Sequence, residues 1–141
     1  MSAKLVKIKL DKGAIAPTRG HPWDGGMDLC ATEDRIIPAK ESAVLDTGVH
    51  LEIPEQWVGL IRSRSGLMCR NGLLTDGTID SHYTGPIKVC LFNHSDFEYR
   101  VNAGDKIAQL VIVPCLIPRL ELVDSLEETD RGDAGFGSTG R

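Results

Sequence analysis

Between residues 35 and 61 the apolar residues come in short runs that are separated by turn-forming residues. Runs of this length and spacing are typical of the strands of an all-β sandwich or barrel. No helical period is long enough to predict more than a short helical turn, at residues 65–71. The predicted fold class is therefore all-β, and the runs that carry the prediction are Ile36–Pro38, Ala43–Leu45, Val49–Ile53 and Trp57–Ile61.

The rest of the chain continues this pattern up to a change of character near residue 124. A length of 141 residues fits one domain with its own core. We expect a β domain over residues 1–123 and a tail over residues 124–141, which is acidic at first and then rich in glycine. The further strands are expected at Lys4–Leu10, Met27–Ala31, Val89–Phe92, Phe97–Val101, Lys106–Val113 and, last, Leu120–Val123.

Composition excludes several classes of function. A net charge of −4 argues against nucleic acid as the main partner, since a protein that binds phosphate backbones carries a basic face. No apolar stretch approaches the roughly 18 residues of a membrane span. The four cysteines are not spaced as metal ligands, and we expect them to be reduced, with Cys90 and Cys115 packed in apolar runs. We therefore expect a soluble cytoplasmic protein, or a host-intracellular one if the source is a virus.

The stretch from Asp76 to Gly85 reads Asp-Gly-Thr-Ile-Asp-Ser-His-Tyr-Thr-Gly. Asp76-Gly77 is a strong turn signal, because glycine adopts positive φ without a Cβ penalty. With apolar residues on either side, the pattern predicts a β-hairpin whose tip presents Asp80 and Tyr83 together. The alternative is an ordinary surface turn that happens to contain an aspartate.

Three kinds of side chain suggest a nucleotide site. Guanidinium groups, hydroxyls and free amides match phosphate oxygens, and rings match the faces of a sugar and a base. A lone carboxylate suits a general base or a group that orients water. The chain lacks both the P-loop and the Rossmann glycine patterns. The candidates are Arg64, Ser65, Gly66 and Arg131 for phosphate, Tyr83 and Phe136 for sugar and base, and Asp80 for water.

Five short motifs occur in order between residues 26 and 140, and together they resemble the trimeric deoxyuridine triphosphatase (dUTPase) family. One such motif would be a weak signal, whereas five in order at family-like separations are very specific. The motifs are Gly26–Leu29, Arg64–Leu67, Gly77–Gly85, Gly104–Leu110 and Arg131–Gly140.

The resemblance implies a jelly-roll-like β-barrel in a homotrimer, with active sites shared between subunits and a mobile tail that closes over a neighbour's site. The implied activity is hydrolysis of dUTP to dUMP and pyrophosphate, which limits uracil incorporation into DNA and supplies dUMP. The implied cofactor is Mg²⁺, bound mainly by the three phosphates, as suits an ion that keeps its waters. No nucleic acid or membrane partner is implied, and a regulatory protein partner stays undecided.

The resemblance also assigns roles to individual residues. Asp80 would hold the water that attacks the α-phosphorus, and Asp28 would reach Mg²⁺ through water. The residues implied to bind phosphate are Arg64, Ser65, Gly66, Gln109, Arg131, Ser138 and Thr139, and those implied to bind the base and the sugar are Gly77, Thr78, Ile79, Tyr83, Phe136 and Gly137.

Two interpretations compete with this one. A dCTP deaminase relative would need a catalytic Glu near the hairpin, and none is found there. A regulatory binding module on the same fold would not need all five motifs intact. Ser63 stands where the family usually has proline, so a less rigid turn is expected there. The roles of Arg62 and Arg70 stay open, His82 is expected to face solvent, and Trp23 and Trp57 are expected to pack.

Overall fold

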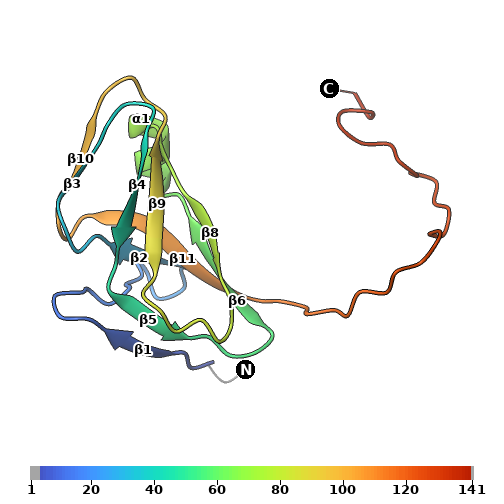
Figure 1. Ribbon diagram of the computed structural model, residues 1–141, viewed down its shortest axis with the longest axis horizontal. Coiled ribbons are helices and arrows are strands. Elements are labelled where there is room, and N and C mark those ends of the chain that lie inside the picture. Colours follow the sequence, from blue (N-terminus) through green and yellow to red (C-terminus); the bar gives the residue numbers. More distant parts are fainter. Residues whose placement is uncertain (1–3, 141) are drawn as a thin grey trace.

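The computed structural model describes residues 4–140, and it consists of short strands with one small helix (Figure 1). Residues 1–3 of the expected β domain and Arg141 of the expected tail lie outside the described residues. The strand pairs of residues 4–140 are all antiparallel, and the all-β class is confirmed. In chain order the elements are β1 (Lys7–Leu10), β2 (Gly26–Cys30), β3 (Arg35–Ile37), β4 (Ser42–Asp46), β5 (Val49–Glu52), β6 (Trp57–Arg62), α1 (Ser65–Asn71), β7 (Leu73–Leu74), β8 (Asp76–Ile79), β9 (Lys88–Asn93), β10 (Tyr99–Val101) and β11 (Lys106–Pro114).

In the described chain the strands form four hydrogen-bonded sheets. The largest has the order β2-β11-β6-β8, and the next has the order β4-β9-β7. Two further pairs, β1-β5 and β10-β3, complete the set. Over residues 4–140 these sheets do not join into one closed barrel. The expected jelly-roll-like barrel is therefore confirmed as an all-β fold, but no closed barrel is found in the described residues.

The hydrophobic core lies between the two larger sheets. Strand β9 alternates between exposed and buried positions, and its Val89 and Leu91 point inward. Ile61 from β6 and Leu110 from β11 join the same cluster from the other sheet. Each fully buried side chain of this size contributes roughly 1.5–3 kcal/mol relative to an exposed one. The period of two along each strand therefore places the two sheets face to face.

The apolar segments that flank residues 76–85 pair as expected, with Leu74 of β7 opposite Phe92 of β9, but the expected turn at Asp76-Gly77 is wrong. Strand β8 pairs with β6, with Gly77 opposite Ile61, while β9 pairs with β4 and β7. Asp76-Gly77 is therefore part of a strand rather than a turn, and Asp76 pairs across the ladder with Arg62 at 3.2 Å. The segment from residue 80 to residue 87 is a loop that crosses from one sheet to the other.

The segment after β11 also differs from expectation. The predicted last strand at Leu120–Val123 does not form in the described chain, and Leu120 and Leu122 are fully exposed. The tail runs away from the body of the molecule (Figure 1). Apolar side chains alternate along this segment, but residues 4–114 of the same chain provide it with no partner strand.

Smaller predictions had mixed outcomes. The short helix at residues 65–71 is confirmed, and it ends at Gly72, whose φ of 66° places it in the left-handed region. Trp57 packs against the core, but Trp23 is exposed and stacks on His21 instead. The four cysteines are free, and Cys90 lies on the exposed face of β9 rather than in the core. Within residues 4–140, no helix has the length and apolar character needed to cross a membrane.

Candidate active site

The turn between β6 and α1 builds a polar cavity of about 300 Å³. Arg64 occupies the N-cap position, and the helix that follows places Ser65 and Arg70 on the cavity wall. Gln109 reaches the cavity from β11, which lies between β2 and β6 in the sheet. The lining combines guanidinium groups with hydroxyl and amide groups, a set that matches phosphate oxygens. In full, it is Arg64, Ser65, Gly66, Leu67, Arg70, Asn71 and Gln109.

Asp28 holds Arg64 beside this cavity. The Asp28 residue is 9% exposed, and its carboxylate pairs with the Arg64 Nε at 3.1 Å and the Lys106 Nζ at 3.2 Å. A buried carboxylate needs such partners, because desolvation without them would be costly. Asp28 therefore fixes the guanidinium of Arg64, and both of its oxygens are already engaged by cations.

Arg70 belongs to the cavity, whereas Arg62 does not. A Cβ placed on Gly66 would lie 2.8 Å from a terminal guanidinium nitrogen of Arg70, so the arginine folds directly over that glycine. Arg62 instead pairs with Asp76 and is not among the lining residues. The sequence did not distinguish Arg62 from Arg70 as a phosphate ligand, and in the structure only Arg70 lines the cavity.

Ser63, which stands where the family usually has proline, is hydrogen-bonded on both sides of its hydroxyl. Its hydroxyl accepts a hydrogen bond from the Thr75 backbone N–H at 2.9 Å and donates one to the Thr75 carbonyl at 2.9 Å. These two bonds close the turn that precedes Arg64. The hydroxyl thus supplies by hydrogen bonding some of the rigidity that a proline ring would supply covalently.

A second, smaller cavity of about 210 Å³ lies at the other end of β8. Among the described strands β8 pairs only with β6, so its outer edge leaves backbone groups free for a ligand. The side chain of His82 is 79% exposed, which confirms that it faces solvent. Lys88, which the sequence analysis did not single out, also lines the cavity. The lining is Thr78, Ile79, Asp80, Tyr83, Pro86 and Lys88.

The Tyr83 ring is seated on the backbone of Gly85. A Cβ at Gly85 would lie 2.6 Å from the Tyr83 hydroxyl oxygen and 2.7 Å from its ring carbon Cζ. The hydroxyl donates to the Pro86 carbonyl at 3.0 Å. Gly85 is thus required for a close approach between ring and backbone, which holds the ring beside Asp80 at the cavity.

The two cavities do not meet within one chain. Strands β6 and β8 run side by side, with Arg62 opposite Asp76 at one end and Gly59 opposite Ile79 at the other. At about 3.3 Å per residue, Asp80 and Ser65 are separated by roughly 20 Å along this pair. The predicted catalytic carboxylate and the predicted phosphate residues are therefore apart in a single subunit.

The candidate residues of the tail stand apart from both cavities. Arg131 donates from Nε to the Ala134 carbonyl at 2.9 Å, and the backbone N–H of Ser138 donates to the Gly135 carbonyl at 3.1 Å. Phe136 is fully exposed at a φ of 50°. None of these residues, nor Gly137 or Thr139, lines either cavity.

Comparison with known proteins shows the family of this chain. The family model described as dUTPase matches residues 12–140. The chain belongs to the dUTPase family. A dUTPase from Clostridium tetani, named deoxyuridine 5'-triphosphate nucleotidohydrolase, is 46% identical over the full length of both chains. A protein of the same name from Arabidopsis thaliana is 44% identical and covers 94% of this chain and 80% of its own.

Solved dUTPase structures share the fold. The dUTPase of Staphylococcus bacteriophage 80alpha with dUPNHPP has a TM-score of 0.93 and 33% identity, covering 99% of this chain and 100% of its own. A mutant dUTPase from phage phi11 of S. aureus, described with a structural Mg(II) ion, has a TM-score of 0.83 and 31% identity. It covers 89% of this chain and 100% of its own.

Proposed function

We propose that the chain hydrolyses dUTP to dUMP and pyrophosphate. The observation that carries this proposal is the dUTPase family match across residues 12–140. The two cavities fit it, because one is lined by phosphate-binding groups and the other by a carboxylate and a ring. A dCTP deaminase relative on the same fold is not favoured by the family match or by the names of the relatives.

In the proposed reaction, Asp80 orients a water molecule and accepts its proton. The water oxygen bonds to the α-phosphorus, the bond from that phosphorus to the oxygen bridging to the β-phosphate breaks, and pyrophosphate leaves. Holding water and substrate in line supplies much of the rate gain. Arg64, Ser65 and Gly66, with Gln109, would bind the phosphates, and Arg70 would add a further charge.

Mg²⁺ fits this site as an ion that is carried by the substrate. The described residues hold no group of three His, Cys, Asp or Glu side chains placed to cage a metal. The donor set therefore suits an ion whose ligands are mostly phosphate oxygens and waters. When bound, Mg²⁺ would neutralise charge on the triphosphate. Asp28 would reach it through water, since its two oxygens already pair with Arg64 and Lys106.

The nucleoside would bind along the free edge of β8. Gly77 and Ile79 are two residues apart, so they present backbone groups to the same side of the strand, where uracil can pair. Thr78 lies between them at the cavity. The Tyr83 ring would pack on the deoxyribose and leave no room for a 2′-hydroxyl, and Phe136, with Gly137, would cover the base when the tail closes.

Assembly into a homotrimer would bring the two cavities together. A separation of about 20 Å within one chain keeps Asp80 from a phosphate held at Ser65, so one cavity must meet the other from a neighbouring subunit. The tail extends away from the body of the domain, so it could reach the active site of a further subunit. There Arg131, Ser138 and Thr139 would bind the outer phosphates. The exposed Leu120 and Leu122 would find their partner strand there.

This activity would limit uracil incorporation into DNA and supply dUMP, in the cytoplasm or, for a virus, within the host cell. A second, regulatory role is a narrower proposal. The staphylococcal phage 80alpha dUTPases are described as controlling transfer of virulence genes by a proto-oncogenic G protein-like mechanism. A protein partner of this chain would have to be found by experiment.

The proposed function is tested by measuring pyrophosphate release with Mg²⁺ from dUTP, UTP, dTTP and dCTP. We expect turnover of dUTP alone, because the β8 edge would exclude the thymine methyl and Tyr83 would exclude a ribose. Release of a uridine nucleotide from dCTP would indicate the deaminase instead. A folded trimer that turns over none of the four nucleotides would contradict the proposal and would indicate that the site serves binding rather than catalysis.

Replacing Gly85 by Ala should weaken dUTP turnover through Tyr83. The added Cβ meets the Tyr83 ring, and overpacking of this kind costs typically 1–3 kcal/mol. If this cost falls on the bound transition state, kcat/KM drops by roughly 5- to 150-fold. Gly25→Ala is the matched control, since a Cβ there meets nothing within 4 Å. Equal kcat/KM values for the two variants would show that the contact between the Tyr83 ring and Gly85 has no role in turnover.

A further inference from the structure

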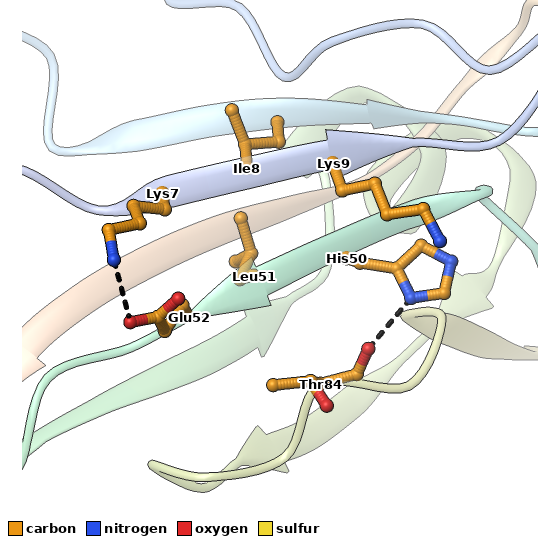
Figure 2. A pocket seen from close by; sticks show the side chains of 7 residues that line it. All are labelled: Lys7, Ile8, Lys9, His50, Leu51, Glu52 and Thr84. Carbon is orange, nitrogen blue, oxygen red and sulfur yellow. Dashed lines mark hydrogen bonds and ion pairs between the residues drawn. The ribbon is translucent and has the colours of Figure 1, made fainter.

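His50 connects the loop that carries Asp80 and Tyr83 to Asp11, which directly follows strand β1. It lies on β5, and its side chain is 17% exposed. The ring Nδ1 is 2.7 Å from the carbonyl oxygen of Thr84, the residue after Tyr83 (Figure 2). The ring Nε2 is 3.1 Å from each carboxylate oxygen of Asp11. The ring thus bridges a loop and the end of β1.

Both contacts require the ring to donate. A carbonyl oxygen only accepts hydrogen bonds, and an ionised carboxylate also only accepts. A neutral imidazole carries one N–H and could satisfy either Thr84 or Asp11, but not both. Only the imidazolium carries a hydrogen on each nitrogen, so the observed geometry is that of a cation.

The charges around the ring favour the same form. The hydrogen bond to the Thr84 carbonyl, followed by that to Asp11, raises the pKa of His50 above its ordinary value. Partial burial and the ammonium of Lys9, which lies across the strand pair, lower that pKa by less. His50 lines a third cavity, of about 300 Å³, between β1, β5 and Thr84. The other charged residues of its lining besides Lys9 are Lys7 and Glu52, which pair with each other at 3.2 Å (Figure 2).

We propose that His50 is a positioning residue that, as a cation, clamps the 80–85 loop to Asp11 and so holds Asp80 and Tyr83 for dUTP hydrolysis. The role in hydrolysis rests on the proposed function, whereas the clamp itself does not. The other histidine contact of this loop, His82 with Glu55 at 3.2 Å, is exposed on both sides and contributes little.

The direction of the pH dependence follows from the raised pKa. A group whose pKa is higher in the folded state stabilises that state fully below its unfolded value, near 6.5. This contribution is lost as the pH rises through the folded pKa. The clamp is therefore closed at acidic pH and opens as the pH rises through the raised pKa of His50.

Kinetics of two substitutions at His50 test the clamp. His50→Gln carries no charge, and its single amide nitrogen cannot take the places of both ring nitrogens. With this variant we expect kcat/KM for dUTP to fall roughly tenfold at pH 6. At pH 9 wild type and this variant should differ by less than about twofold, because the wild-type ring is then neutral. His50→Arg, which stays charged, should match wild-type activity at pH 6 and exceed it at pH 9.

His94→Gln is the matched control, since the His94 ring contacts Phe92 and lies outside both cavities. Dividing the wild-type profile of kcat/KM against pH by that of each variant cancels the effect of the ionisation of dUTP, which is common to both. A wild-type to His50→Gln ratio that stays constant from pH 6 to pH 9 would overturn the clamp. A ratio of about one throughout would overturn it as well.

A ring titration by ¹⁵N NMR separates the clamp from the activity. At pH 6.5 we expect more than half of the His50 rings to carry a proton on both nitrogens, because the pKa is raised above about 6.5, and we expect a lower pKa in Asp11→Asn. Between pH 6 and pH 9 the rate of amide hydrogen exchange in the 80–85 loop should rise more in wild type than in His50→Arg, because only the wild-type ring loses its charge. If these results hold while dUTP is not turned over, the clamp stands and the proposed function fails. A ring that is already neutral at about pH 6.5 overturns the clamp whatever the activity.

Discussion

Replacing Asp80 by Asn is expected to lower kcat for dUTP by about 10²–10⁴-fold, the range for loss of a general base. The amide keeps the size of the carboxylate but cannot accept the proton of the attacking water. Asp80 lies at the end of β8 and lines the smaller cavity beside Tyr83. Since the phosphates would bind at the other cavity, KM should change by no more than a few fold.

Asp76→Asn is the control for this change. Asp76 lies at the opposite end of the same strand, where its exposed carboxylate pairs with Arg62. An exposed ion pair contributes at most about 1 kcal/mol to stability, so this variant should keep wild-type kcat. The measurement is steady-state pyrophosphate release, with dUTP binding followed by calorimetry. An Asp80→Asn enzyme with more than a tenth of wild-type kcat would remove Asp80 from the chemistry.

Mixing two inactive variants should restore activity if the site is shared between subunits. Asp80→Asn would lack the carboxylate, and Arg64→Ala would lack the guanidinium that Asp28 holds at the phosphate cavity. When the two are unfolded together in equal amounts and refolded, random assembly should leave roughly a quarter of the sites intact. Each such site would take Asp80 from one subunit and Arg64 from another.

The control is to mix the two variants without unfolding, which should yield no activity until subunits exchange. A chain that carries both substitutions, refolded with an equal amount of wild type, should leave roughly a quarter of the sites intact if the site is shared, against about half if one chain supplies both groups. Absence of recovery from the two single variants would contradict a site that takes Asp80 and Arg64 from different subunits.

Local patterns in the sequence determined the fold class and most of the elements. Alternation of apolar residues depends only on neighbours along the chain, so the strands at residues 26–30, 57–62 and 106–114 and the helix at 65–71 could be predicted. Arg64 and Ser65 lie together at one cavity, as their chemistry suggested, and Gln109, which the family resemblance implied, lies there too. Asp80 and Tyr83 likewise share a cavity.

Only the tertiary structure decided which distant segments meet. The Asp76-Gly77 pattern indicated a turn, but these residues belong to β8, which pairs with β6. Strand pairing depends on register and burial across the whole sheet, which a local pattern does not contain. The apolar segment at residues 120–123 had strand composition but no partner strand in the described part of its own chain. His50 gave no signal in the sequence, because its contacts with Asp11 and Thr84 join residues 39 and 34 positions away. Sequence carries short-range periodicity, whereas these contacts come from packing between sheets.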